Sequence, residues 1–454
     1  MISTHTVIRH RLGGFSLIEL MVAMLLGILV SIGLVSLFGT TSSANKVQNA
    51  LALLQENGRF AVTRVNADLR MVDAPFCSSS GGRATLTPNG AVDSPVATFI
   101  YFSSLFLPDS NGNLAGPPAG WPPGNNNAYP LSPSINLQGY ECDKGGTTCV
   151  TDPSFLPKQG ITAGLRVPGS DAITLRYLQG TGWPVTAVVP VSSTSCTVTA
   201  TRSSSDPAFN FGTNDRLFIG VCNNPEATNA NISVSGNTLT ATLNGLTGNN
   251  ATQCGTWPLN STHVYNFSKD FVTVTYYLRY DADPSPDAPA GRVIPDLIRR
   301  FNGGSAKGGS EDVVVQGVDR LDFLYGVNDN NGAVTYLTAD KVDDRNGGAI
   351  TCPAGPAQFQ NGGTPYPDQT GCLWRAVRSI EVHMMLDTIN NLYAISANDT
   401  PYCYSIDPQT SLATVDCSKQ SNYKIPASTD FNGMPGQMMR REFVSLIGVR
   451  NAVL

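Results

Sequence analysis

Charged side chains are scarce in this chain. Asp, Glu, Lys and Arg make up 14% of its 454 residues, whereas an ordinary soluble domain has roughly 25%. The formal net charge is −5, so the basic face that most nucleic-acid binders use is not expected. A disordered chain is also excluded, because disorder goes with high net charge and few apolar residues, and 41% of this chain is hydrophobic.

Catalytic motifs are missing as well. The sequence contains no Gly-x-Ser-x-Gly, no His-Glu-x-x-His and no phosphate-binding Gly-x-x-x-x-Gly-Lys-Ser/Thr. Two of the four histidines lie in the first 14 residues, so histidine-based catalysis would depend on His263 or His383. His383 lies in a strand-like run, and we interpret it as a packed or face-exposed strand residue. The sequence therefore predicts neither an enzyme nor a cofactor.

The charge is lowest from Phe15 to Phe38, a run of 24 residues whose single charged side chain is Glu19. A helix needs about 20 such residues to cross a bilayer. The first 14 residues carry two arginines and no acid, which is the charge retained on the cytoplasmic side. A secretory signal peptide has an apolar region of only about 7–15 residues. An ordinary signal anchor explains the length but leaves Gly13-Gly14 and Glu19 without a role.

The order Gly13-Gly14-Phe15, with Glu19 as the fifth residue counted from that Phe, resembles the class III signal of type IV prepilins and pseudopilins. The resemblance implies that a prepilin peptidase cuts after Gly14 and methylates the new amine of Phe15. It also implies that Glu19 pairs with the N-terminal amine of a neighbouring subunit. Such a partner is expected physically, because a carboxylate in a membrane helix costs about 2.5–3.5 kcal/mol.

A second apolar stripe continues the helix beyond the membrane. Its members recur at helical spacing: Val47, Leu51, Leu54, Ala61, Val65, Leu69 and Val72. Pro75 ends the pattern, because the residue before a proline disfavours helix. We expect one helix from about residue 16 to 72. The segments are a leader (1–14), a transmembrane or filament-core helix (15–38) and an amphipathic second half (39–73).

The remainder is rich in strand-like runs. Alternating or β-branched patterns occur at residues 97–103, 171–178, 185–191, 216–221, 237–243, 271–280, 379–386 and 441–449. We therefore expect an α+β fold, in which a long N-terminal helix packs on an antiparallel, pilin-like β-sheet head with an enlarged β-rich insertion. The Pro-rich loop 281–291 is a candidate lobe boundary. It divides an insertion lobe with long loops (74–280) from a C-terminal β-rich head (281–454).

Several segments resemble minor pilins of the PilW type: residues 54–77, 313–332, 374–388 and 440–451. The resemblance implies a minor pilin that primes assembly of a type IV pilus or caps its tip. Its implied partners are prepilin peptidase, other minor and major pilins, and the inner membrane. The head is periplasmic before assembly and part of an extracellular filament afterwards. The alternatives are a type II secretion pseudopilin, whose heads are usually smaller, and a tip adhesin that binds a surface ligand through the enlarged middle.

All ten cysteines follow the apolar run, in the part expected to lie in an oxidising compartment, so disulfides are predicted. Spacing does not fix the connectivity. Near neighbours are the favoured pairs: Cys142–Cys149, Cys352–Cys372 and Cys403–Cys417. No Cys-x-x-Cys is present, and neither histidine outside the leader has ligand spacing from a cysteine pair, so no metal site is expected.

One polar turn, Asn328–Gly332, has alternating oxygen ligands. Asp329 and Asn331 are candidate Ca²⁺ ligands there, although an EF-hand loop needs a bidentate acid about twelve residues from its first ligand. A turn of Asn and Gly between two strands is the simpler interpretation.

Overall fold

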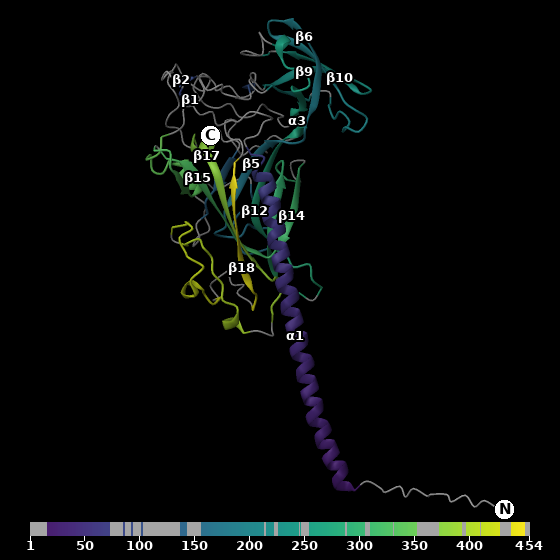
Figure 1. Ribbon diagram of the computed structural model, residues 1–454, viewed down its shortest axis with the longest axis vertical. Coiled ribbons are helices and arrows are strands. Elements are labelled where there is room, and N and C mark those ends of the chain that lie inside the picture. The colour runs from purple at the N-terminus through teal and green to yellow at the C-terminus, as the bar shows by residue number, and fades with distance from the viewer. Residues whose placement is uncertain are drawn as a thin grey trace, which may run out of the picture.

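A long helix, α1 (Leu17–Leu69), projects from a β-rich body (Figure 1). In this computed structural model the residues described are 16–72, 85–86, 92–93, 101–102, 137–142, 156–212, 215–221, 226–244, 246, 254–286, 288–304, 309–329, 331–351, 372–392, 396–408, 410–426 and 437–449. The predicted helix is confirmed, with its end three residues earlier than expected. The first half of α1 stands away from the body, and the second half lies along it.

Two antiparallel sheets form the part of the body that holds α1. One has the order β16-β15-β17-β18 and consists of Val334–Leu337, Val318–Asn328, Val377–Asp387 and Arg440–Gly448. The other has the order β14-β13-β12-β5-β4 and consists of Ser310–Gln316, Val293–Phe301, Phe271–Ala282, Ala172–Leu178 and Leu137–Tyr140. Both sheets and α1 contribute to one core, in which Val65, Val274 and Phe323 are buried.

A separate lobe is built from strands that lie between β5 and β12 in the sequence. They are β6 (Trp183–Ser192), β7 (Ser195–Thr201), β8 (Leu217–Gly220), β9 (Glu226–Ser235), β10 (Thr238–Asn244) and β11 (His263–Asn266). Their pairings run β10-β7-β6-β11-β8-β9, and β9 pairs with β10 in turn. The pairings therefore close into a ring, in which each of these six strands has a partner strand on both sides over at least part of its length. A core of its own fills this barrel lobe, including Trp183, Val198 and Leu239.

Three very short strands come earlier in the chain. β1 (Thr85–Leu86) and β2 (Val92–Asp93) pair with each other, and β3 (Tyr101–Phe102) lies parallel to β9.

The α+β fold is confirmed, but the barrel lobe is smaller than the predicted insertion. Leu178 at the end of β5 faces Phe271 at the start of β12, so the lobe is inserted between two paired strands. Strands β4 and β5, which lie inside the predicted insertion 74–280, belong to the five-stranded sheet. The loop 281–291, taken as a candidate boundary, connects β12 and β13, which pair along their length. It is a hairpin connection within one sheet.

Candidate functional site

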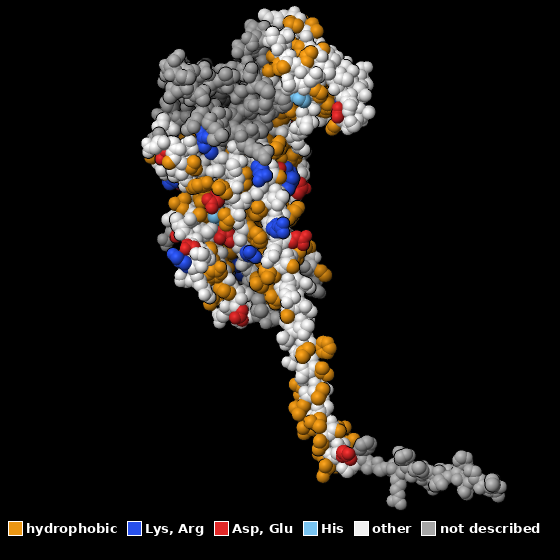
Figure 2. All heavy atoms as spheres, viewed as in Figure 1, with side chains coloured by type: hydrophobic (Ala, Val, Ile, Leu, Met, Phe, Trp, Pro, Cys, Tyr) orange, Lys and Arg blue, Asp and Glu red, His pale blue; other side chains and the backbone are white. Residues whose placement is uncertain are grey.

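The projecting half of α1 is the most unusual surface of the molecule. One 18-residue window of the helix has a mean hydropathy of 2.6 with none of its residues buried, and α1 is long and apolar enough to cross a membrane. Figure 2 shows this half as a narrow rod of hydrophobic and white atoms. Exposed apolar side chains of this kind must be covered by lipid or by other protein. The amphipathic second half differs, because one of its faces is already covered by the body.

Glu19 lies in the first turn of α1, and its backbone N–H donates to Ser16 Oγ at 3.1 Å. Ser16 is thus the N-cap, and Ser-x-x-Glu has the spacing of a capping box. The positive end of the helix dipole favours a carboxylate here. Glu19 itself is exposed on the isolated chain. Gly14 and Phe15 lie outside the described residues, so the predicted cleavage position stays a prediction.

Ser16 was not identified from the sequence as the N-cap of the helix, although its spacing from Glu19 is that of a capping box. The cap matters for Glu19 because it fixes where the helix begins, at Leu17, two residues after the predicted N-terminal Phe15 of the mature chain.

The second half of α1 is held against the edge strand β18. Gly58 lies beneath the ring of Phe443, so closely that a Cβ atom there would come within 2.2 Å of the ring. One and two turns further on, Ala61 and Val65 are fully buried. Asn66 Nδ2 then donates to Ser445 Oγ at 2.9 Å. A small residue at position 58 is therefore required for this close approach.

A buried polar cluster fixes the end of α1 to the five-stranded sheet. The carboxylate of Asp68 accepts hydrogen bonds from Tyr276 Oη at 2.6 Å, Tyr177 Oη at 2.9 Å and Arg299 Nε at 2.7 Å. The side chains of Asp68 and Arg299 are 6% and 10% exposed. Burial, with the Asp68 charge beside it, raises the pKa of Tyr177 to about 12 and also raises that of Tyr276. Both tyrosines therefore stay protonated and donate.

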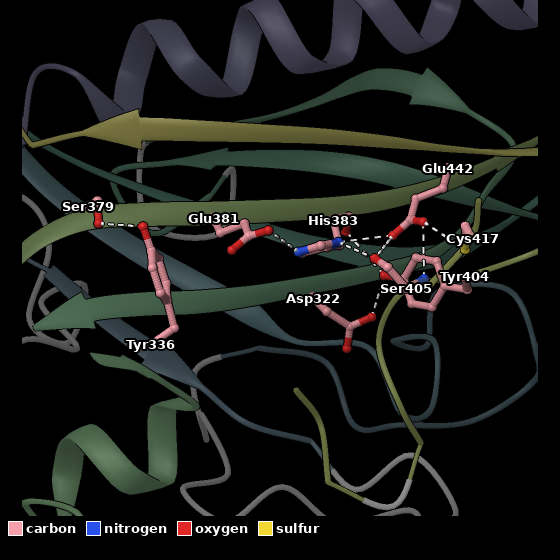
Figure 3. A network of polar contacts seen from close by, with 9 residues as sticks. All are labelled: Asp322, Tyr336, Ser379, Glu381, His383, Tyr404, Ser405, Cys417 and Glu442. Atoms are coloured by element: carbon pink, nitrogen blue, oxygen red, sulfur yellow. Dashed lines mark hydrogen bonds and ion pairs between the residues drawn. The ribbon is translucent and has the colours of Figure 1, made fainter. Parts of the chain in front are cut away.

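A second polar network surrounds His383, on the face of the four-stranded sheet that is turned away from α1 (Figure 3). His383 is 1% exposed. Its Nδ1 is 2.9 Å from Glu442 Oε1 and 2.9 Å from Ser405 Oγ. Its Nε2 is 3.1 Å from Glu381 Oε1, an ion-pair distance without hydrogen-bond geometry.

This network contains serine, histidine and carboxylates, so it must be compared with a nucleophilic triad. In a triad the serine hydroxyl is free to give its proton to histidine and to reach a substrate. Here the Ser405 hydroxyl donates to Glu442, and its backbone N–H donates to the same carboxylate at 3.0 Å. The ring is also shielded from solvent. These contacts fasten a loop to the sheet and give no positive sign of catalysis.

The candidate Ca²⁺ ligand Asp329 lies in a turn. Its Oδ1 accepts the backbone N–H groups of Asn331 and Ala333, at 2.9 and 2.8 Å. The carboxylate thus closes the turn between β15 and β16, as an Asx-turn does. Within the described ranges, no group of three or more His, Cys, Asp or Glu side chains is placed to hold a metal ion.

Disulfides join Cys403 to Cys417 and Cys196 to Cys254. The second pair closes the barrel lobe across 58 residues and was not among the favoured near neighbours. Cys142 is also disulfide-bonded. Cys149, Cys352 and the side chain of Cys372 lie outside the described residues, so those expected pairings stay predictions.

Comparison with known families bears on the part of the body that holds α1. Residues 275–451 match the family model described as type IV pilus-assembly protein W. The match supports a relation to type IV pilus assembly. It begins within β12 and ends after β18, so it includes Tyr276, Arg299, Phe443 and Ser445, all of which contact α1. Searches among curated proteins and solved structures gave no match.

Proposed function

We propose that this chain is a minor pilin of a type IV pilus. It is inserted in the inner membrane through the first half of α1, with its body in the periplasm, and is cut by prepilin peptidase after Gly14. It then joins other minor and major pilins, where it primes the filament or caps its tip. The observation that carries the proposal is the exposed apolar half of α1, projecting from a body that matches a pilus-assembly family.

Glu19 gives the proposal a mechanism. In lipid, a lone carboxylate and a lone ammonium are each costly, whereas a hydrogen-bonded pair of the two is tolerable. The methylated amine of Phe15 on a neighbouring subunit would supply the positive charge. Pairing would then select helices at the correct axial offset as they leave the membrane for the filament.

The second half of α1 connects the helix that pairs through Glu19 to the β-rich body. Asp68 and Arg299 form a buried pair, and Gly58 and Phe443 are in close contact, so helix and body are tied at separate points along α1. A subunit pulled by its helix therefore carries the body with it as one unit.

The test compares Glu19→Gln with Glu56→Gln, an exposed carboxylate on the second half of the same helix. We expect Glu19→Gln to insert in the membrane normally but to fall at least about tenfold in sheared pili, with Glu56→Gln unchanged. A Gly14→Val variant should remain longer by the 14-residue leader on a gel. Normal incorporation of Glu19→Gln, or normal processing of Gly14→Val, would contradict the proposal.

Two other functions share this machinery. A type II secretion pseudopilin would use the same helix, but its usual small head fits poorly with 454 residues. A tip adhesin is favoured by one observation: the barrel lobe lies at the end of the body away from the projecting half of α1 (Figure 1). In a filament tip, that end would face outward and could meet a surface ligand.

A further inference from the structure

The direction of β18 shows which end of the body is turned toward the projecting half of α1. Gly58 of α1 lies beneath Phe443 of β18, and Asn66, eight residues further along the helix, bonds to Ser445. Helix and strand therefore run the same way, and the start of β18 lies toward the apolar half. If that half is inserted in the inner membrane, as proposed above, the start of β18 belongs to the membrane-facing end of the body.

One stretch of chain at this end, residues 418–426, we call the base segment. Residues 410–426, yellow in Figure 1, reach the same end of the body as the start of β18. The base segment is fixed there, because Lys424 and Tyr402 exchange two backbone hydrogen bonds of 2.8 Å. The Cys403–Cys417 disulfide ties the chain just before it to the same place. Its side chains are therefore presented from a defined position.

The base segment exposes two large side chains that are mainly apolar. Tyr423 is 44% exposed and Ile425 is 51% exposed. The backbone at Tyr423 is extended, with φ −75° and ψ 135°, and alternate residues of an extended chain point to the same side. We therefore expect the two side chains to project together. A tyrosine, with an apolar ring and a polar tip, is enriched where a membrane meets water.

The charged residues of the base segment are both basic. They are Lys419 and Lys424, and the segment contains no acid. Lys419 forms an ion pair at 3.4 Å with Asp416, which lies just before the segment. Lys424 is exposed between the two apolar side chains. One lysine near an anionic lipid surface strengthens binding about fivefold, so the composition of the segment matches phospholipid headgroups of negative charge.

The distance to the membrane is short enough for contact. Phe443 is level with Gly58, twenty residues or about 30 Å of helix beyond Phe38, where the apolar run ends. Strand β18 begins three residues earlier, about 10 Å nearer to the membrane. The headgroup layer extends about 5–8 Å toward the body. Transmembrane helices are tilted by about 20° on average, and a tilt of α1 toward the base segment closes the remaining distance.

We propose that the base segment is a docking site for anionic phospholipid headgroups on the periplasmic face of the inner membrane. Tyr423 and Ile425 enter the interface, and Lys424 lies beside a lipid phosphate. The site rests on the proposed insertion of α1 and adds a second attachment of the same subunit to the membrane.

Docking would give α1 a fixed rotation about its own axis. Helix and body are tied together by the Asp68–Arg299 pair and by the contact between Gly58 and Phe443. A body held on the headgroups therefore holds the helix as well, and Glu19 faces one direction within the membrane. An arriving subunit then meets Glu19 from that side. The lipid contact breaks when the subunit leaves the membrane for the filament.

The test measures lipid contact at position 423 in the full chain, inserted in nanodiscs of phosphatidylcholine with or without phosphatidylglycerol. Tyr423→Trp places a fluorophore in the base segment. Thr240→Trp places one on an exposed strand of the barrel lobe as the control. With brominated lipids, we expect loss of the fluorescence that Tyr423→Trp adds to the natural chain, and no loss of the fluorescence that Thr240→Trp adds.

Further changes in the Tyr423→Trp chain separate the two parts of the contact. Ile425→Ser should lower the ratio of docked to free bodies about fivefold. Val334→Ser, which removes an equally exposed side chain from β16, should leave that ratio unchanged. Lys424→Gln should lower it about fivefold in discs with phosphatidylglycerol and leave it unchanged in discs of phosphatidylcholine alone.

Flotation of the discs distinguishes failure of this site from failure of the proposed function. A chain that does not enter the discs contradicts the insertion of α1 and the docking site together. A chain that enters them, with position 423 quenched no more than position 240, overturns the docking site alone. So would quenching that Ile425→Ser and Lys424→Gln leave unchanged. A blue shift of the added emission without bromine quenching would place the base segment against protein and also overturn the proposal.

Discussion

Asp68 joins the end of α1 to the five-stranded sheet through a buried carboxylate. Its carboxylate is bonded to Arg299 and two tyrosines in a shielded site. We expect Asp68→Asn to lower the free energy of unfolding by about 3 kcal/mol, because it leaves the Arg299 charge buried without a partner. Urea unfolding of the full chain in micelles measures this, with the exposed Asp312→Asn as control.

A second substitution separates charge from packing at this site. In the Asp68→Asn background, Arg299→Met removes the uncompensated charge and should recover most of the lost stability. If Asp68→Asn unfolds at the same urea concentration as Asp312→Asn, the buried pair is not what fixes the helix.

The buried carboxyl group of Asp296 is expected to make the stability of the folded chain depend on pH. Burial raises its pKa to about 7, against a hydrogen bond from Gln316 that lowers it, and the nearby Asp281 carboxylate adds to the rise. An acid with a raised pKa stabilises the folded chain below its unfolded value, near 4, and this contribution is lost as the pH rises to about 7. The side chain at position 296 does not titrate in the Asp296→Asn variant, so this variant does not lose that stability as the pH rises.

We therefore expect Asp296→Asn to gain about 2 kcal/mol relative to the natural chain between pH 4.5 and pH 8, after allowance for solvent screening. Thermal unfolding of both chains across this range measures it, with Asp312→Asn again as control. A difference between the two chains that does not change with pH would show that Asp296 is ionised throughout.

At the scale of elements, helix α1 could be predicted from the sequence because the residues that define it are close together in the chain. Seven apolar residues at helical spacing and a proline beyond them placed its limits within three residues. Of that stripe, Leu54, Ala61, Val65, Leu69 and Val72 are buried. Asp68 could not be singled out, because its partners Tyr177, Tyr276 and Arg299 lie between 109 and 231 residues away in the sequence. A lone acid beside an apolar stripe looks like a surface residue.

Strands were readable one at a time, but their pairing was not. The pattern at 171–178 predicted β5 and the pattern at 271–280 predicted β12, yet nothing local indicates that these two strands are neighbours. Their pairing spans the whole barrel lobe. The Pro-rich loop 281–291 was a candidate boundary because of its composition. The barrel lobe instead joins the sheet at Leu178 and Phe271, where the sequence carries no comparable signal.

At the scale of the whole molecule, the described residues form three parts in line: the apolar half of α1, the two sheets that hold its second half, and the barrel lobe (Figure 1). The lobe is joined to the sheets by stacked aromatic rings. Phe267 lies 4.7 Å from Phe271, the first residue of β12, and 6.1 Å from Phe218 of the barrel, between ring centroids. Such stacks favour a defined orientation over a loose tether.

The insertion point allows a clean removal of the lobe. Leu178 and Phe271 face each other, and Gln179 N–H donates to the carbonyl of Asp270 at 2.7 Å. Replacing residues 180–269 by Asn-Gly should therefore close β5 and β12 as a two-residue hairpin. Because Tyr177, Tyr276, Arg299, Phe443 and Ser445, which contact α1, are all kept, we expect the shortened chain to be processed and to support pilus numbers close to normal by electron microscopy. Loss of pili, with the shortened chain stable in the membrane, would show that the lobe takes part in assembly.

Surface attachment of the same cells decides the adhesin alternative. A fall in attachment with pili still present supports a tip adhesin, and unchanged attachment contradicts it.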